Sequence, residues 1–237
     1  MIIRVIVLGL CLAAASVPAQ AQQTVHVPAA EAAAPEETAS ALRDVYQALF
    51  FDSGMFDAMA EHYLPIYRQT ITSSDLYRLG GERRRADLDA LIARTPELMR
   101  DEVIAEADTM SSNIAPEISA LFTPEELRDY ADLIRLPLWQ RHIQAMAQQA
   151  AENNGDPHDY QPVFTAEERA ELEAMEQRPG AQALMRSGGA LNAILHREMQ
   201  AAGPRMQARL QQRLASEFCN LLGNDCPPAL RASIRPT

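Results

Sequence analysis

The chain of 237 residues carries a formal net charge of −11, and 47% of its residues are hydrophobic. Every one of its 21 basic residues is an arginine. The acidic balance disfavours binding to nucleic acids and anionic membranes, which depends on clustered cations. The lack of lysine excludes Schiff-base chemistry and a phosphate-loop lysine, because a guanidinium group stays protonated.

The first residues have the features of a secretory signal peptide. A basic start at Arg4 precedes an apolar run over residues 5–15, which is too short to span a bilayer. An Ala-x-Ala pattern then ends at Ala21, so we predict that residues 1–21 are cleaved after export and that the mature protein is periplasmic. Retention as an uncleaved anchor is the alternative. Residues 22–34 are rich in Ala, Val and Pro without helical spacing, and we expect a flexible arm there.

The rest of the chain has the pattern of an all-α protein. Leu42, Val45 and Leu49 recur at three- and four-residue spacing, as on one face of a helix that begins near Pro35. Ala, Leu and Met, which are good helix formers, dominate the apolar residues, and no segment has the alternation of a hairpin strand. We therefore expect an all-α domain over residues 35–218, built from helical hairpins packed into one compact bundle.

An internal repeat marks the starts of two helices. The run Phe-Thr-Pro-Glu-Glu from Phe122 recurs as Phe-Thr-Ala-Glu-Glu from Phe164, about 42 residues later. In such a capping box the Thr hydroxyl accepts from the amide three residues on, and the Glu carboxylate accepts from the Thr amide. We therefore predict structural caps within repeats near residues 122–150 and 164–195, formed by Thr123 with Glu126 and by Thr165 with Glu168.

A fainter copy of this pattern lies upstream, where Thr72 and Asp75 have the same spacing and predict a third cap. Pro137 and Pro179 stand at equivalent positions after the two complete caps. Because proline ends one helix and suits the first turn of the next, we expect each repeat to be a helix, a tight corner and a second helix.

Three further positions predict interruptions of helices. Pro65 is expected to bend or break its helix, and Gly188-Gly189 and Gly203-Pro204 are expected to separate helices. After the last of these, four apolar residues at four-residue spacing predict a final amphipathic helix. They are Met206, Leu210, Leu214 and Phe218.

The repeats resemble the bacterial family of domain of unknown function 2059 (DUF2059), whose pattern runs Phe-Thr-x-x-Glu-Leu, an aromatic pair, and Ser-Pro-x-Gly-Gln. The matching positions are Phe122, Thr123, Glu126, Leu127, Pro137 and Gln140, then Phe164, Thr165, Glu168, Pro179 and Gln182. Both copies depart from the pattern at the serine, the glycine and the aromatic pair. The resemblance covers roughly residues 60–200, and it implies a helical fold and export without implying an activity.

Removal of the leader leaves Cys219 and Cys226 as an even pair of cysteines. In an oxidising compartment we expect them to form a structural disulfide that ties the C-terminal tail, residues 219–237, to the last helix. Closing so short a loop contributes roughly 2–3 kcal/mol in the chain-entropy model. A functional dithiol is the alternative.

The sequence predicts no catalytic residue, no metal site and no cofactor. Glu125-Glu126 and Glu167-Glu168 are carboxylate pairs that could bridge a metal or act as acid and base. Neighbours in sequence do not share a helix face, however, and acids in a first turn stabilise the helix dipole. The histidines lack the Glu-x-x-His and His-Glu-x-x-His spacings of helical metal sites. They are His26, His62, His142, His158 and His196.

Two residues are candidates for a binding surface. His62 lies beside Glu61 and Tyr63 and could form a pH-sensitive site, although the sequence favours a surface or hydrogen-bonded histidine. Trp139, the sole tryptophan, follows the corner at Pro137, where either burial between hairpins or a binding role is consistent with the sequence.

These observations favour an exported, non-catalytic helical module that binds a protein partner or an apolar ligand in the cell envelope. We expect neither a nucleic-acid partner nor stable membrane insertion after signal cleavage. The alternative is a hydrolase-like enzyme with a dispersed site between the repeats, using Glu126 or Glu168 with His142 or His196. Self-association of the two hairpins is a third hypothesis.

Overall fold

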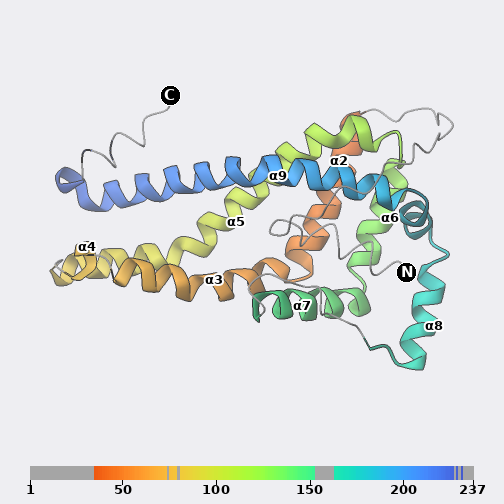
Figure 1. Ribbon diagram of the computed structural model, residues 1–237, viewed down its shortest axis with the longest axis horizontal. Coiled ribbons are helices and arrows are strands. Elements are labelled where there is room, and N and C mark those ends of the chain that lie inside the picture. The colour runs from red at the N-terminus through yellow and green to blue at the C-terminus, as the bar shows by residue number, and fades with distance from the viewer. Residues whose placement is uncertain are drawn as a thin grey trace. The chain divides into compact units, whose positions relative to one another are not determined.

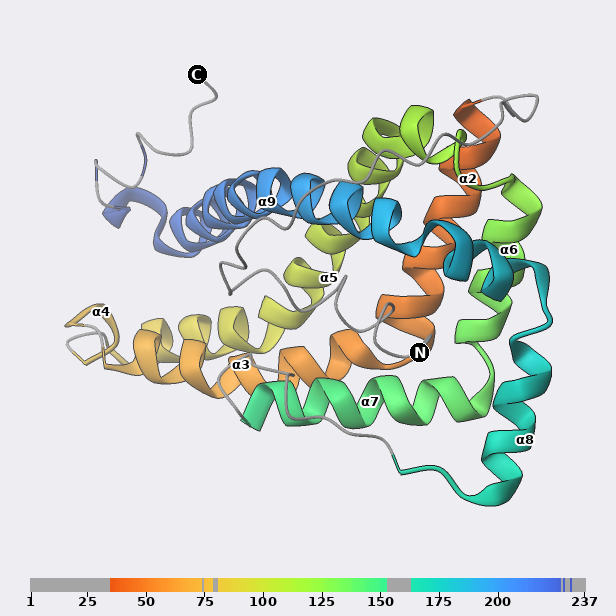
Figure 2. The ribbon, with the colours of Figure 1, turned by 45° about the vertical axis from the view of Figure 1, so that its right-hand side comes forward.

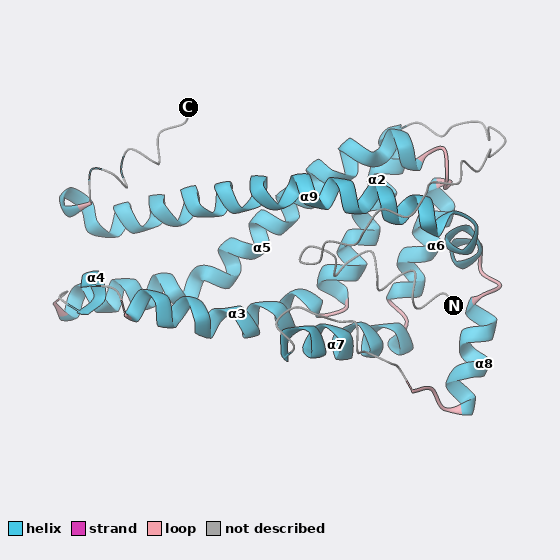
Figure 3. Cartoon of the chain, viewed as in Figure 1, coloured by secondary structure: helices cyan, strands magenta, loops and turns pink. Residues whose placement is uncertain are grey.

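The described part of the chain is helical. The computed structural model describes residues 35–73, 75–78, 81–152 and 163–226, together with residues 228 and 231. These residues form helices and no strand (Figure 1 and Figure 3), so the all-α prediction is confirmed. The predicted signal peptide, residues 1–21, and the predicted arm, residues 22–34, lie outside the described residues.

Short connections join most of the elements, and a longer one, residues 153–165, separates α7 from α8. In chain order they are α2 (Pro35–Tyr46), the π-helix η1 (Gln47–Asp52), α3 (Met55–Thr72), α4 (Asp75–Arg78), α5 (Glu82–Ile118), α6 (Pro124–Ile134), α7 (Pro137–Glu152), α8 (Ala166–Met175), α9 (Pro179–Leu222) and the 3-10 turn η2 (Gly223–Asp225). Among the described residues, no helix has the length and apolar composition needed to cross a bilayer.

The chain divides into two compact units. Unit 1 takes the residues up to Ala58 and Ala107–Ala202, and unit 2 takes Met59–Glu106 and the residues from Gly203 onward. The helices α3, α5 and α9 each contribute residues to both units.

Unit 1 has a hydrophobic core to which α2, η1, the end of α5, α6, α7 and the first part of α9 contribute. α2 packs along α6 (Figure 2), and α6 also contacts η1 and α7. Buried aliphatic side chains of this core include Leu42, Leu49, Ile114, Ile118, Leu127, Ile134, Leu138, Ile143 and Leu184.

Polar side chains hold the end of η1. Arg135, just after α6, donates from Nε to Oδ2 of Asp52 over 2.8 Å, and Nε2 of Gln144 in α7 donates to the carbonyl oxygen of Ser53 over 2.7 Å. Burial raises the pKa of Asp52, but hydrogen bonds, chiefly the one from Arg135, outweigh it and hold the pKa below its usual value. Gly54 then adopts φ +75°, which strains other residues, and α3 begins after it.

Capping boxes start α6 and α8. The hydroxyl of Thr123 accepts from the amide of Glu126 over 3.2 Å, and the Thr123 amide donates to Oε2 of Glu126 over 2.9 Å. Thr165 and Glu168 make the same two bonds, over 3.2 Å and 2.8 Å. Each start is therefore stabilised by two hydrogen bonds that the local sequence specifies.

In each pair of helices that a capping box opens, the second helix begins with a proline. Pro137 is the first residue of α7 and Pro179 is the first residue of α9, so both pairs have the expected order of helix, corner and helix. The internal repeat of about 42 residues stays a prediction.

The third cap, predicted at Thr72 and Asp75, is wrong. Thr72 is the last residue of α3, and its hydroxyl donates to the carbonyl oxygen of Arg68 over 2.8 Å. A threonine hydroxyl near a helix end often bonds the carbonyl four residues earlier, so Thr72 ends a helix instead of starting one. The next helix, α4, begins at Asp75 itself.

None of the three predicted positions ends a helix. α3 continues through Pro65, and α9 continues through Gly188-Gly189 and through Gly203-Pro204. An internal proline costs a helix about 3 kcal/mol, but packing of the buried helix face supplies most helical stability in a folded protein. Local composition therefore did not decide where these helices end.

Unit 2 has its own buried residues and the disulfide. Leu88, Leu91 and Ile92 of α5 are buried at helical spacing. Cys219, in α9, and Cys226, just after η2, are disulfide-bonded with their Cα atoms 4.9 Å apart, as the sequence predicts. Of the C-terminal tail, only residues up to 226, with 228 and 231, are described.

Candidate functional site

A cavity in unit 1 is the main candidate site. Its volume is about 230 Å³, and it lies among α6, α7, α8, the start of α9 and the residues just before α8. Most of its lining is apolar and is contributed by Leu133, Ile134, Ile143, Leu172, Met175, Ala181 and Leu184. Ligand sites of proteins are concave and largely apolar with a few polar groups, which is the composition found here.

The helix starts described above position this lining. The capping box at Thr165 starts α8, which places Leu172 and Met175 on its cavity face. Gly180, in the first turn of α9, allows α9 to approach α6, because a Cβ atom there would lie 2.6 Å from the backbone nitrogen of Tyr130. Oδ2 of Asp129 in α6 also accepts from the Gly180 amide over 2.8 Å.

Three aromatic side chains line the cavity. Trp139, at the start of α7, is only 7% exposed and also lines the cavity. Phe164 precedes the cap of α8 and packs its ring against the imidazole of His142, with ring centroids 4.4 Å apart. Tyr130 of α6 completes the set.

Tyr130 brings a hydroxyl group to this lining. The residue is 9% exposed, and within the described residues its hydroxyl makes no hydrogen bond. Burial of the residue raises the pKa of Tyr130 above its usual value, so the hydroxyl stays protonated over the physiological range. A tyrosine hydroxyl both donates and accepts hydrogen bonds, so this group can serve as a donor or acceptor for a ligand.

Charged residues of α8 and its C-terminal end complete the lining. Glu173 and Glu176 line the cavity, and no ion pair joins either carboxylate to a cation of the described chain. Arg169 lies on the same helix and donates from Nε to the carbonyl oxygen of Thr165 over 3.3 Å. The cavity is therefore apolar inside and carries more negative than positive charge.

The glutamates of the two capping boxes form hydrogen bonds and ion pairs outside the cavity. Besides the cap bonds, Oε1 of Glu126 accepts from Arg186 over 3.1 Å, and Oε1 of Glu168 accepts from Arg141. The hydrogen bond from the Thr165 amide is the main reason why the pKa of Glu168 lies below its usual value. Neither glutamate lines the cavity.

The histidines of the enzyme hypothesis also lie outside the cavity lining. Burial, with the nearby Arg141, lowers the pKa of His142, so the ring is largely neutral at neutral pH. His196, in α9, is hydrogen-bonded through Nε2 to Gln200 over 2.8 Å. The side chain of His62, the second candidate for a binding surface, lies outside what the structure describes.

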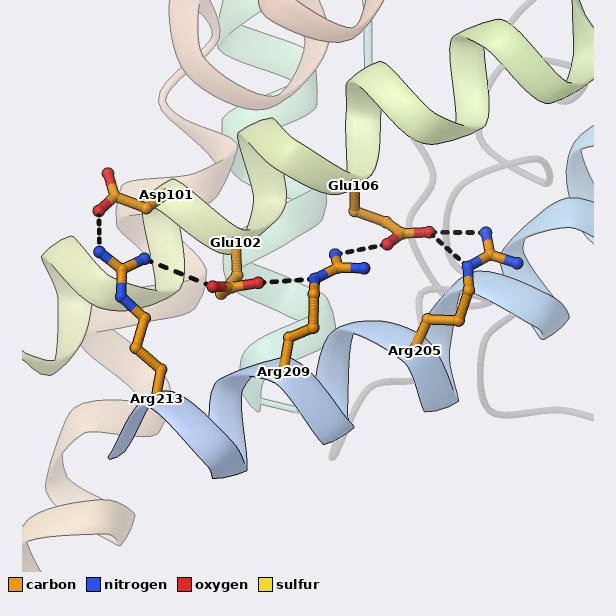
Figure 4. A network of polar contacts seen from close by, with 6 residues as sticks. All are labelled: Asp101, Glu102, Glu106, Arg205, Arg209 and Arg213. Carbon is orange, nitrogen blue, oxygen red and sulfur yellow. Dashed lines mark hydrogen bonds and ion pairs between the residues drawn. The ribbon is translucent and has the colours of Figure 1, made fainter. Parts of the chain in front are cut away.

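A second charged cluster lies in unit 2 and joins α5 to α9 (Figure 4). Nε of Arg209 donates to Oε2 of Glu102 over 2.8 Å, and its Nη2 donates to Oε2 of Glu106 over 2.5 Å. Arg205 contacts Glu106 over 2.7 Å, and Arg213 extends the series to Glu102. We call these residues, with Asp101, the arginine ladder.

The arginine ladder is a structural element. The side chains of Glu106 and Glu102 are only 5% and 11% exposed, and each carboxylate is shared between two arginines. The hydrogen bonds that Arg209 donates to the carboxylates of Glu102 and Glu106 raise the pKa of Arg209 above its usual value. Because the buried carboxylates are already paired, the ladder offers them little capacity to bind a further ion.

Comparisons with known proteins and a search for metal sites add no further assignment. No family model, curated protein or solved structure matches the chain. Among the described residues, no group of three or more His, Cys, Asp or Glu side chains could hold a metal ion.

Sequence analysis identified Trp139 but missed most of the cavity. Tyr130, Leu172, Glu173 and Glu176 belong to different turns of two helices that are separated along the chain. The only local indication was the row of acidic residues in α8, which also fits an exposed helix face. These residues come together only because α8 and the start of α9 pack close to α6.

Proposed function

We propose that the protein is an exported, non-catalytic binding module of the cell envelope that holds a small, largely apolar ligand in the cavity of unit 1. The supporting observation is the cavity itself, with its apolar walls, its aromatic rings and the hydroxyl of Tyr130. Its volume of about 230 Å³ is below the range of drug-sized pockets, which favours a small ligand.

Export and membership of DUF2059 are parts of this proposal. The basic, apolar and Ala-x-Ala segments of residues 1–21 support export, and the disulfide between Cys219 and Cys226 is consistent with an oxidising compartment. The two capping boxes stand at the Phe-Thr-x-x-Glu positions of the family pattern, which supports the family proposal.

The alternatives have less support. A hydrolase would need Glu126 or Glu168 beside a histidine in a cavity, whereas both glutamates are engaged in helix caps and with arginines. A partner protein that inserts an apolar side chain would use the same cavity. Four large apolar side chains are exposed among the described residues: Ile104 in α5, Val163 before α8, and Met185 and Leu221 near opposite ends of α9.

Intrinsic fluorescence tests this proposal directly, because Trp139 is the only tryptophan and lines the cavity. We expect the neutral probe N-phenyl-1-naphthylamine to bind saturably and to change the Trp139 emission. The variant Leu172→Arg places a long, charged side chain on the half-buried cavity wall and should weaken binding of the neutral probe by about tenfold or more, since this side chain occupies part of the cavity and a charge beside an apolar ligand is costly.

Met185→Arg is the matched control, because Met185 is exposed, lies in the same unit and does not line the cavity. It should bind the probe as the wild-type protein does. Circular dichroism would establish that both variants keep their helices. The absence of saturable binding to the wild-type protein, or equal binding by the two variants, would overturn the proposal.

A further inference from the structure

The charge and the aromatic rings of the cavity restrict the chemical class of its ligand. Glu173 and Glu176 bring two carboxylates that have no cation of the described chain paired with them. Arg169 brings one positive charge and is hydrogen-bonded to the Thr165 carbonyl. The net charge of the cavity lining is therefore negative, and the formal net charge of the whole chain, −11, is negative too.

The same cavity is rich in aromatic surface. Tyr130, Trp139 and Phe164 all contribute to a lining that encloses about 230 Å³. The face of an aromatic ring attracts a cation electrostatically when the cation lies within about 6 Å of the ring centre, and tryptophan does so most strongly. Aromatic rings beside free carboxylates suit an organic cation whose surface is apolar but whose charge is spread over methyl groups.

A neutral or anionic ligand explains fewer of these features. A neutral apolar ligand would use the apolar walls and the rings but not the carboxylates of Glu173 and Glu176. An anion would meet two carboxylates and only one arginine. The hydroxyl of Tyr130, which makes no hydrogen bond within the described residues, adds a group that can bond a ligand hydroxyl or ammonium.

We propose that the ligand held by the cavity of unit 1 is a small organic cation of the alkylammonium class, with its methylated head against the rings of Tyr130, Trp139 and Phe164 and its charge balanced by Glu173 and Glu176. This inference rests on the proposed function, because it requires that the cavity binds a ligand. It specifies that the ligand is positively charged and belongs to the alkylammonium class, which apolar binding alone does not require.

A pair of isosteric probes tests the charge. Choline and 3,3-dimethylbutan-1-ol have nearly the same shape, and only choline carries a positive charge. Titration of the full mature chain, followed by Trp139 fluorescence, should show choline binding roughly twofold to thirtyfold more tightly than the alcohol, which corresponds to the range of measured cation–π contributions.

Matched double variants test the residues. Glu173→Gln with Glu176→Gln should reduce the advantage of choline over the alcohol, because this pair removes the two carboxylates and leaves the rings in place. Glu167→Gln with Glu171→Gln is the control, because it changes the net charge equally, at residues of α8 that do not line the cavity. The control should keep the advantage of choline. Circular dichroism would check that both double variants keep their helices, and the single variants would replace a pair that failed to fold.

Each outcome is decisive. Equal binding of choline and the alcohol, or an equal loss in the two double variants, would overturn the assignment of an organic cation and leave the apolar binding site standing. Binding of N-phenyl-1-naphthylamine without binding of choline would do the same. If no probe bound to the wild-type protein, the proposed function would fail, and the inference with it.

Discussion

At the scale of single residues, Gly180 shows how closely the cavity walls are packed. A Cβ atom at this position would lie 2.6 Å from the backbone nitrogen of Tyr130 and 2.7 Å from the carbonyl oxygen of Glu126. Both neighbours are backbone atoms of α6, so they cannot rotate away as a side chain would. The requirement for glycine here is steric, since its backbone does not adopt a positive φ.

We predict that Gly180→Ala destabilises the protein by roughly 1–3 kcal/mol, the usual cost of overpacking a core. Gly189→Ala is the control, because this glycine is also inside α9 and a Cβ atom there would meet nothing within 4 Å. Alanine is the better helix former, so the control should be stabilised by about 0.5–1 kcal/mol. Urea denaturation of both variants measures the difference, and a similar change in both would contradict the steric argument.

At the scale of secondary-structure elements, the arginine ladder sets how α5 and α9 pair within unit 2. Arg205, Arg209 and Arg213 recur every four residues and so share one face of α9. The buried carboxylates of Glu102 and Glu106 on α5 lie between these arginines, so that arginines and carboxylates alternate (Figure 4). A shift of one helix along the other would leave a carboxylate buried without its partner.

Arg209 is the central member of the ladder, because it contacts both Glu102 and Glu106. We predict that Arg209→Gln lowers the free energy of unfolding by about 1–3 kcal/mol, since removal of one partner leaves buried charge uncompensated, while the partial exposure of Arg209 reduces the cost. Thermal unfolding followed by circular dichroism would measure the loss.

The ion pair between Arg94 and Glu217, also in unit 2, provides the comparison. Arg94 is more than half exposed and its shortest distance to Glu217 is 3.4 Å. Exposed ion pairs contribute little, so Arg94→Gln should change the free energy of unfolding by no more than about 0.5 kcal/mol. Equal effects of the two substitutions would show that the ladder is no stronger than an ordinary surface pair.

At the scale of the whole molecule, the proposed export is consistent with the disulfide. Cleavage after Ala21 would remove Cys11 and leave Cys219 and Cys226, which are bonded to each other. The bond closes a short loop in unit 2 and contributes roughly 2–3 kcal/mol by restricting the unfolded chain.

We predict that the protein, expressed in a bacterium with its own N-terminus, is recovered from the periplasm as a chain that begins at Gln22 and has no free thiol. Intact-mass measurement, with and without reduction and alkylation, tests both points together. A mature chain that keeps residues 1–21 would contradict cleavage and favour the uncleaved anchor. Two alkylatable thiols before reduction would favour the functional dithiol.

The sequence by itself determined the helical class, the caps of α6 and α8 and the cysteine pair, because each depends on residues close together in the chain. A capping box needs only Thr123 and Glu126, and a short disulfide loop needs only two cysteines near each other. The local pattern was insufficient at Thr72, where the same spacing occurs at the end of a helix.

Only the tertiary structure decided where the long helices end, which charges are paired and where the cavity lies. α9 continues through Gly203-Pro204 although the local sequence favours a break. The arginines of α9 fit an exposed polar face in sequence, and they are half-buried because Glu102 and Glu106 lie far upstream on α5. Burial and pairing are properties of surfaces brought together from distant parts of the chain, and short-range spacing carries no information about them.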